Sequence, residues 1–169
     1  MKKIVRLSFQ GALLLVAAFA AAGISNLVQD KPIVMAPESQ TGKTPAFAKA
    51  RKVLEANCLN CHSSQAVMPW YANLPLIKQL IESDIREGRH HMDMEKRVFA
   101  PGKTPTVKTL KEIGKEVRKD QMPPLIYKAA HWRSFLSAED KAAIQEWVDQ
   151  ELAAADAAVV PAPASPATT

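Results

Sequence analysis

The chain has 169 residues with a formal net charge of +5, and 47% of its residues are hydrophobic. Three of the positive charges, Lys2, Lys3 and Arg6, lie in residues 1–22, which contain no acid, so the rest of the chain carries a net charge of +2. This balance excludes the strongly basic surface that is typical of nucleic-acid-binding proteins, and we expect no nucleic-acid partner. The length suits one small domain.

An export signal is the first element in the chain. The basic residues Lys2, Lys3 and Arg6 precede an apolar run over residues 13–22, which ends in small residues typical of a cleavage site. We therefore predict that residues 1–22 are a signal peptide, cleaved near Ala22. Because apolar residues also flank this run, its length approaches that of a membrane span, and an uncleaved anchor in the inner membrane is the alternative. Either way the folded part is exported, which in a Gram-negative cell means the periplasm.

Composition divides the remaining chain into three parts. Residues 23–44 contain prolines and glycine without apolar periodicity, which predicts a flexible linker. Residues 45–152 form the folded domain. Residues 153–169 pass from an alanine-rich stretch into alternating alanine and proline, which predicts a disordered tail. The domain is small, so a buried cofactor would have to supply part of its apolar interior.

The most specific feature of the domain is the sequence Cys58-Leu59-Asn60-Cys61-His62. Two thiols three positions apart, followed at once by an imidazole, are the requirement for covalent attachment of a c-type haem. The two sulfurs add to the two vinyl groups of the porphyrin, and the histidine is then the proximal ligand of the iron. We therefore predict one haem c, bound through Cys58 and Cys61, with His62 coordinating the iron.

Two other chemistries use paired cysteines. A thioredoxin-like redox pair lies beside a strand and a helix of a βαβ unit, whereas the residues before Cys58 have helical spacing. A structural zinc site needs four ligands, and the histidines at positions 90, 91 and 131 form no second ligand pair with Cys58 and Cys61, which are the only cysteines. Both chemistries fit the sequence less well than haem does.

Hydrophobic periodicity predicts about four helices and no strand. Apolar side chains with helical spacing occur in residues 47–54, which lead into the cysteine motif, in residues 75–88, from residue 104 to residue 117, and in residues 137–152. Ser137 is the expected cap of the last helix, and Gly88 is the expected stop of the second. We expect Trp147 in the core, packed against the first helix. The fold class is thus all-α: a small cytochrome c-like bundle wrapped around one haem.

The second axial ligand decides what such an iron site does. A sixth protein ligand makes an electron carrier, whereas a vacant position makes a site for small molecules or peroxide chemistry. We predict Met122, because Pro123 and Pro124 hold the backbone in an extended loop from which a thioether can point inward. A methionine that fills an irregular gap in the core is the other interpretation. His90 and His91 are alternative ligands, although adjacent histidines are also typical of an exposed helix end.

Four further residues are candidates for contacts with the haem. Trp70 and Tyr71 can pack on the porphyrin edge or hydrogen-bond a propionate, but they are equally typical of core aromatics with a polar tip. Arg89 and His131 can neutralise propionates. An exposed arginine and a loop histidine with local partners are the alternatives for these two residues.

The order of these motifs resembles that of a known family. The chain contains Cys58-x-x-Cys61-His62, Pro69-Trp70-Tyr71, Gly88-Arg89, Met122-Pro123-Pro124-x-x-Tyr127, His131 and Leu136-Ser137-x-x-Asp140 with Trp147. Over residues 47–150 it is similar to the small periplasmic haem-binding domain family of mono-haem c-type cytochromes. The resemblance implies a compact, mainly helical cytochrome c with the Met-Pro-Pro loop on the distal side. Such domains also occur joined to or beside di-haem peroxidase-like proteins, which implies a redox partner of that kind.

We expect an electron carrier and not an enzyme, which passes single electrons between redox partner proteins in the periplasm while both axial ligands stay bound. The alternative is a haem enzyme or gas sensor whose sixth iron position is open or weakly ligated, as in a peroxidase-like protein. Eight basic residues lie between positions 96 and 119, against two acids. They are either an ordinary solvated helix face or a docking surface for an acidic redox partner.

Overall fold

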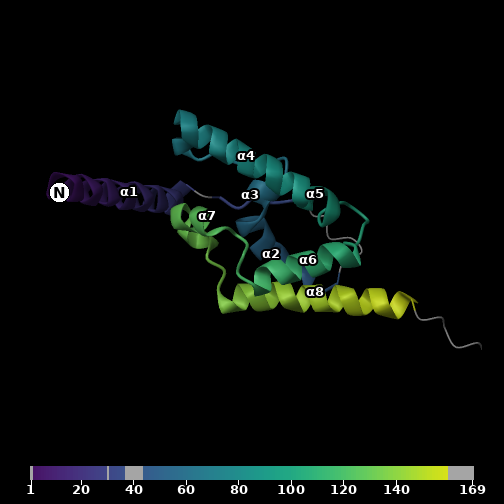
Figure 1. Ribbon diagram of the computed structural model, residues 1–169. Coiled ribbons are helices and arrows are strands. Elements are labelled where there is room, and N and C mark those ends of the chain that lie inside the picture. Colours follow the sequence, from purple (N-terminus) through teal and green to yellow (C-terminus); the bar gives the residue numbers. More distant parts are fainter. Residues whose placement is uncertain (1, 30, 37–43, 160–169) are drawn as a thin grey trace, which may run out of the picture.

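Every regular element in residues 2–29, 31–36 and 44–159, the residues that the computed structural model describes, is a helix (Figure 1). For residues 2–8 and 159 the description covers the backbone alone. The helices are α1 (Lys2–Gln29), α2 (Phe47–Asn57), α3 (Leu59–His62), α4 (Pro75–His91), α5 (Met94–Arg97), α6 (Val107–Arg118), α7 (Leu125–Ala130) and α8 (Ala138–Val159), with the 3-10 helices η2 (Trp70–Asn73) and η3 (Trp132–Ser134). The all-α prediction is confirmed.

The core lies between α2, α6 and α8. Helix α8 packs against both α2 and α6 (Figure 1). Phe47 of α2 contacts Trp147 of α8 with ring centroids 5.4 Å apart, and both side chains are buried. The apolar stripes predicted for these three helices are buried as expected, with Leu54, Leu110 and Ile144 almost completely inaccessible. Because α2 leads directly into α3, this core also fixes the position of the cysteine motif.

Side-chain caps set where two of the core helices begin. Helix α6 starts after Thr106, whose hydroxyl accepts a hydrogen bond from the backbone N–H of Thr109 at 3.2 Å. Helix α8 has a reciprocal cap: the Ser137 hydroxyl accepts from the backbone N–H of Asp140 at 3.1 Å, while the Asp140 carboxylate accepts from the backbone N–H of Ser137 at 2.9 Å. This arrangement satisfies two N–H groups that a helix start otherwise leaves without partners. The cap predicted at Ser137 is confirmed.

Helix α4 runs past Gly88, where the sequence predicted a stop. The backbone N–H of Met92 donates to the carbonyl oxygen of Gly88 at 2.8 Å, so the helical hydrogen bonds continue to the end of α4. Gly88 is needed instead for the close packing of α4 against the cysteine motif. A Cβ atom at position 88 would lie 2.6 Å from the carbonyl oxygen of Cys61, so only glycine allows α4 to approach the cysteine motif this closely.

The segments between the four predicted helices contain short helices. Helix α5, helix α7 and the 3-10 helices η2 and η3 lie in them. Each has six residues or fewer, which is too short for hydrophobic periodicity to reveal. These short elements position most of the side chains of the candidate site.

The segment predicted to be a flexible linker is ordered where it is described. Residues 23–29 belong to α1, and residues 31–36 pack on the domain with Ile33 and Met35 buried. These two side chains point the same way because alternate residues of an extended segment share a face. The buried Arg51 guanidinium donates to the carbonyl oxygen of Met35, and the Glu55 carboxylate accepts from the backbone N–H of Met35 at 2.8 Å. Residues 30 and 37–43 lie outside the described residues.

Helix α8 extends further than the sequence predicted. Residues 153–159, expected to begin a disordered tail, continue the helix to Val159. Alanine, which dominates this stretch, has the highest intrinsic helix propensity. The rest of the predicted tail, residues 160–169, lies outside the described residues.

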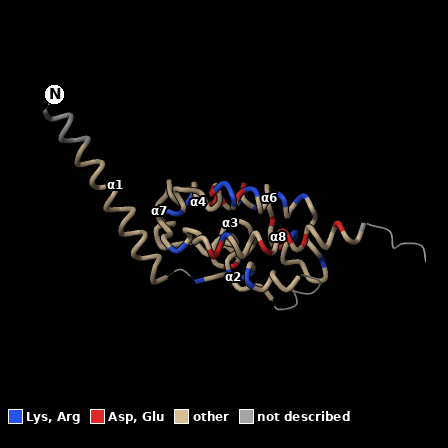
Figure 2. The backbone as a smooth tube through the Cα atoms, turned by 90° about the horizontal axis from the view of Figure 1, so that it is seen from below, with Lys and Arg blue, Asp and Glu red and all other residues tan. Residues whose placement is uncertain are grey.

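Helix α1 projects from the domain and carries no charged residue from position 9 onward (Figure 2). Its segment Phe9–Gln29 spans 21 residues, and the most apolar stretch of 18 residues in it has a mean hydropathy of 2.0 and is 11% buried. The helix is long and apolar enough to cross a membrane. A signal peptide and a membrane anchor both meet this description.

Candidate functional site

The cysteine motif forms a single helical turn. The backbone N–H groups of Cys61 and His62 both donate to the carbonyl oxygen of Cys58, at 3.3 and 3.1 Å. Residues three and four positions apart share a face of a helix, so this turn directs both sulfurs and the imidazole to the same side. Both cysteines are free thiols. The backbone of the motif is therefore already in the conformation that places the two sulfurs and the imidazole on one side for attachment of a haem.

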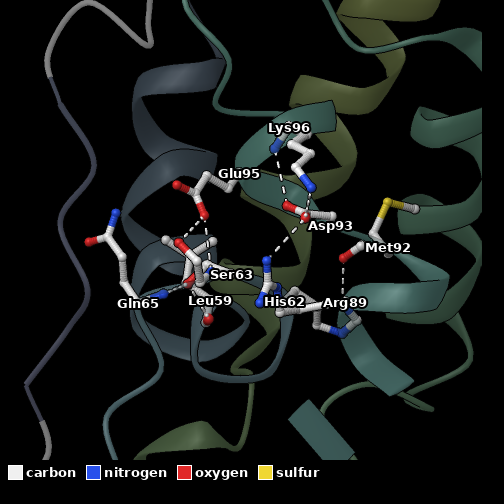
Figure 3. A network of polar contacts seen from close by, with 10 residues as sticks. Leu59, His62, Ser63, Gln65, Arg89, Met92, Asp93, Glu95 and Lys96 are labelled. Atoms are coloured by element: carbon white, nitrogen blue, oxygen red, sulfur yellow. Dashed lines mark hydrogen bonds and ion pairs between the residues drawn. The ribbon is translucent and has the colours of Figure 1, made fainter. Parts of the chain in front are cut away.

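His62 has a ring orientation that suits a metal ligand. Its Nδ1 atom lies 2.8 Å from the carbonyl oxygen of Met92 (Figure 3). Since a carbonyl oxygen can only accept, Nδ1 carries the proton and Nε2 keeps its lone pair for coordination. Burial lowers the pKa of His62, and hydrogen bonds to the carbonyls of Met92 and Gly88 oppose that shift without reversing it. The ring is thus neutral at physiological pH, as coordination requires.

A polar network holds the backbone that orients His62 (Figure 3). Asp93 caps α5 by accepting from the backbone N–H of Lys96 at 3.2 Å, and its carboxylate also pairs with the ammonium of Lys96 at 3.1 Å. Glu95 accepts from the backbone N–H and the hydroxyl of Ser64, at 3.0 and 2.6 Å. Helix α5 is therefore tied to the residues that follow His62. The sequence interpretation missed these residues, although an acid three positions before Lys96 is a recognisable cap signal.

The two thiols are held in their protonated form. Burial, followed by the charge of Cys61, raises the pKa of Cys58 to about 12. Burial, followed by the charge of Asp84, raises the pKa of Cys61 to about 11. A thioredoxin-like pair needs the opposite shift, because the thiolate is its nucleophile. A zinc site is equally poorly supported, since the described residues contain no group of three His, Cys, Asp or Glu side chains that could hold a metal ion.

An apolar cavity of about 380 Å³ reaches the cysteine motif at Asn60, while Cys58, Cys61 and His62 are not among its lining residues. One wall is the apolar face of α4, with Ile77, Leu80, Ile81 and Ile85, and Asn60 of the cysteine motif also lines it. The sequence predicted an apolar face on this helix, yet no residue of α4 is buried. A helix whose apolar stripe is only partly covered by protein fits a site for a large apolar group. A porphyrin has this character.

Tyr71 and His131, both predicted to contact the cofactor, meet at the wall of this cavity. The Tyr71 hydroxyl lies 2.8 Å from His131 Nε2, and the His131 ring stacks on Tyr127 with centroids 4.1 Å apart. The Tyr127 hydroxyl accepts from the side-chain amide of Asn60 at 3.3 Å, which joins the cluster to the cysteine motif. Trp70 also lines the cavity and is 51% exposed. The structure therefore brings three of the predicted residues together.

Arg89 has a buried donor that no group in the described part of the chain satisfies. Its Nε atom is inaccessible and lacks a hydrogen-bond partner there, while its Nη2 atom lies 3.7 Å from the Asp93 carboxylate. Buried polar groups are nearly always hydrogen-bonded, so an orphaned guanidinium donor points to a missing acceptor. A carboxylate such as a haem propionate would satisfy it. The donor set and the cavity thus both fit haem.

Met122 lies outside this cluster. It is 38% exposed, in the loop between α6 and α7, and it is not among the described residues that line the cavity. The Asp120 carboxylate fixes the start of this loop by pairing with Lys141 at 3.1 Å and with Lys128 at 3.5 Å. The alternative ligands, residues 90 and 91, are exposed at the end of α4. The ligand of the sixth iron position stays a prediction.

The all-α domain, the imidazole with its free Nε2 atom and the adjoining apolar cavity together define a haem protein. The chain belongs to the haem-binding domain family, Haem_bd, whose model matches residues 17–150. The family resemblance is thereby confirmed, and the match begins inside α1.

A sequence relative is the cytochrome c peroxidase Ccp of Escherichia coli (strain K12), which is 31% identical over 114 residues. The match covers 64% of this chain and 24% of that protein, so the chain spans about a quarter of the length of the curated relative it matches. No solved structure matches the chain significantly.

Proposed function

We propose that the protein is a periplasmic mono-haem c-type cytochrome that transfers single electrons between redox partner proteins. In this proposal Cys58 and Cys61 bind the haem through thioether bonds, and His62 is its proximal ligand. The observation that carries it is the hydrogen bond of 2.8 Å between His62 Nδ1 and the Met92 carbonyl oxygen. This bond leaves Nε2 free, next to two thiols that are neither oxidised nor ionised.

A bound haem c supplies an iron that accepts and returns one electron. The chain contributes the surroundings of that iron. The Met92 carbonyl fixes the orientation of the imidazole, the apolar face of α4 excludes water, and the orphaned donor of Arg89 provides positive charge for a propionate. In the proposed carrier Met122 occupies the sixth position, which favours ferrous iron relative to two histidines.

A haem enzyme or gas sensor is the second candidate function, and the exposure of Met122 supports it. Met122 is 38% exposed, in the loop between α6 and α7. If it stays away from the iron, the sixth position is open to small molecules or peroxide. The similarity to Ccp supports the same candidate, because that protein is a cytochrome c peroxidase. The chain would then act as a peroxidase-like protein.

The proposed partners of the carrier are other redox proteins, among them a di-haem peroxidase-like protein. The basic stretch from Lys96 to Lys119 supports such an association, since Lys96, Lys108 and Lys115 have side chains that are 75%, 82% and 57% exposed. Complementary charge raises the rate of encounter with an acidic partner and makes it depend on salt. A periplasmic location agrees with the N-terminal apolar helix.

Mass and optical spectrum of the exported full-length chain test the proposal. The protein is produced in a host that matures c-type haem, next to a Cys58→Ser/Cys61→Ser variant as control. We expect the mass of one haem on the native protein under denaturing conditions and none on the variant. Colourless, unmodified native protein from such a host overturns the proposal.

The spectrum of the same sample separates the two candidate functions. A low-spin ferric spectrum with the red charge-transfer band of methionine ligation supports the electron carrier. A high-spin spectrum that shifts on addition of cyanide, or of carbon monoxide after reduction, supports the enzyme or sensor.

A further inference from the structure

The C-terminal end of α1, which includes Gly23 and Asn26, packs against the domain. Gly23 is buried against the indole of Trp132, and a Cβ atom at position 23 would lie 2.3 Å from Trp132 Cε2. Only a glycine allows the backbone of α1 to lie on this ring. The peptide bond between Ala22 and Gly23, where the sequence predicts cleavage, is therefore part of a continuous helix in contact with η3.

Asn26 fastens the same end of α1 to the wall of the cavity. Its side chain is 2% exposed, and its amide donates to the carbonyl oxygen of Ala130 at 2.9 Å and to the Tyr71 hydroxyl at 3.1 Å. A buried amide is costly unless it is hydrogen-bonded, so these contacts fix the position of α1 specifically. Because Tyr71 also bonds His131, α1 is linked to residues that line the cavity.

From Phe9 to Ala22, α1 is apolar apart from Gln10, and most of its side chains are exposed. Phe9, Leu14 and Val16 are 71%, 71% and 66% exposed. A helix that is hydrophobic all round needs an apolar environment. Residues 7–24 would cover roughly 27 Å at 1.5 Å per residue, close to the thickness of the hydrocarbon core of a bilayer. The basic residues near position 1 and Trp132 near position 23 then fall at the two interfaces, where such residues are enriched.

Five residues that cleavage would remove line the cavity together with α4: Leu15, Ala18, Phe19, Ala21 and Ala22. The family match also begins at residue 17, so it includes part of the apolar run. A discarded leader has no reason to share sequence with a haem-binding domain or to complete its cavity. These observations favour retention over removal.

We propose that α1 is retained as an uncleaved membrane span whose outer end is an integral part of the haem-binding domain, with Asn26 as a positioning residue for the cavity wall. The lipid bilayer surrounds residues 7–24, so the part of the cavity that Leu15, Ala18 and Phe19 line lies at the depth of the bilayer. The proposal is independent of whether the haem carries electrons or reacts with small molecules.

Intact mass after fractionation tests retention. The full-length chain is produced in a host that matures c-type haem, and membrane and soluble fractions are washed with alkaline carbonate and analysed. We expect residues 1–169 plus one haem in the washed membranes. A soluble protein with the mass of residues 23–169 plus one haem overturns retention and leaves the proposed function intact. Membrane-bound residues 1–169 without haem support retention and count against the proposed function.

Two glycine substitutions in the retained helix test its docking. A Cβ atom at Gly11 meets nothing within 4 Å, whereas one at Gly23 meets Trp132. Gly11→Leu and Gly23→Leu both increase the hydrophobicity of the span, so both variants should remain in the membrane. We expect Gly23→Leu to lower the thermal midpoint of the haem domain by several degrees and Gly11→Leu to leave it unchanged. Equal midpoints for the two variants overturn the docking of α1 on η3.

Discussion

Gly88 of α4 lies directly against the backbone of Cys61. A Cβ atom at position 88 would stand 2.6 Å from the Cys61 carbonyl oxygen, and backbone atoms cannot move aside as a flexible side chain can. We expect Gly88→Ala to push α4 away from the cysteine motif and to lower the free energy of unfolding by about 1–3 kcal/mol. Denaturant unfolding, followed by circular dichroism, measures this change.

The control for this substitution is Gly114→Ala in α6. A Cβ atom there would meet side-chain ends only, Arg118 Nη1 at 3.1 Å and Val148 Cγ1 at 3.2 Å. Alanine is favoured over glycine inside a helix by about 1 kcal/mol, so this variant should be close to neutral or more stable. Similar losses in both variants would show that the contact with Cys61 is unimportant.

His62 is the residue on which the proposed haem ligation depends. We expect His62→Ala to lose the low-spin spectrum, because no other imidazole follows the cysteines in this turn. His90→Ala is the comparison: His90 is exposed at the end of α4, and its loss should leave the spectrum unchanged if Met122 and not His90 is the sixth ligand. The ferric absorption spectrum of each purified variant is the measurement. A low-spin spectrum that survives in His62→Ala would contradict the proximal assignment.

Met122 and Met68 form a matched pair for the sixth ligand, because their side chains are 38% and 39% exposed. If Met122 coordinates the iron, Met122→Ala should abolish the red charge-transfer band entirely, while Met68→Ala should retain it. Near-infrared absorption or magnetic circular dichroism detects this band. An unchanged low-spin spectrum in Met122→Ala removes Met122 from the site and shows that another residue is the sixth ligand.

The charge of Asp93 should make stability depend on pH. Burial opposes ionisation of this carboxyl group, but hydrogen bonds from Lys96 and the charges of Lys96 and Arg89 outweigh it and hold its pKa below the usual range. Because the pKa is lower in the folded protein, the ionised carboxylate stabilises the fold above its ordinary pKa of about 3.9. This contribution disappears as the pH falls through the pKa of the folded state.

We therefore expect Asp93→Asn to lower the free energy of unfolding by about 1 kcal/mol at neutral pH and by progressively less in acid. Urea unfolding at a series of pH values from neutral to strongly acidic measures the difference. Asp149→Asn, which changes an exposed carboxylate of α8, should have little effect at any pH. A loss for Asp93→Asn that does not change with pH would count against the charge of Asp93 as its cause.

Hydrophobic periodicity predicted the core better than it predicted the candidate site. The stripes that contain Leu54, Leu110 and Ile144 repeat with helical spacing, and all three residues are buried. The same spacing in α4 correctly predicted a helix but not its surroundings, since its stripe lines a cavity. Periodicity shows that one face is apolar. It does not show whether protein, cofactor or lipid covers that face.

The sequence by itself determined the helical class and the cysteine motif, because both depend on residues close together in the chain. Only the tertiary structure decided which distant groups serve that motif. The Met92 carbonyl that orients His62 lies thirty positions away, and Asn26, which reaches Tyr71, lies forty-five positions away. A backbone carbonyl is present at every residue and asparagine has no periodic pattern, so neither partner leaves a signal in the sequence. Such contacts arise when packing of the helices brings distant segments together.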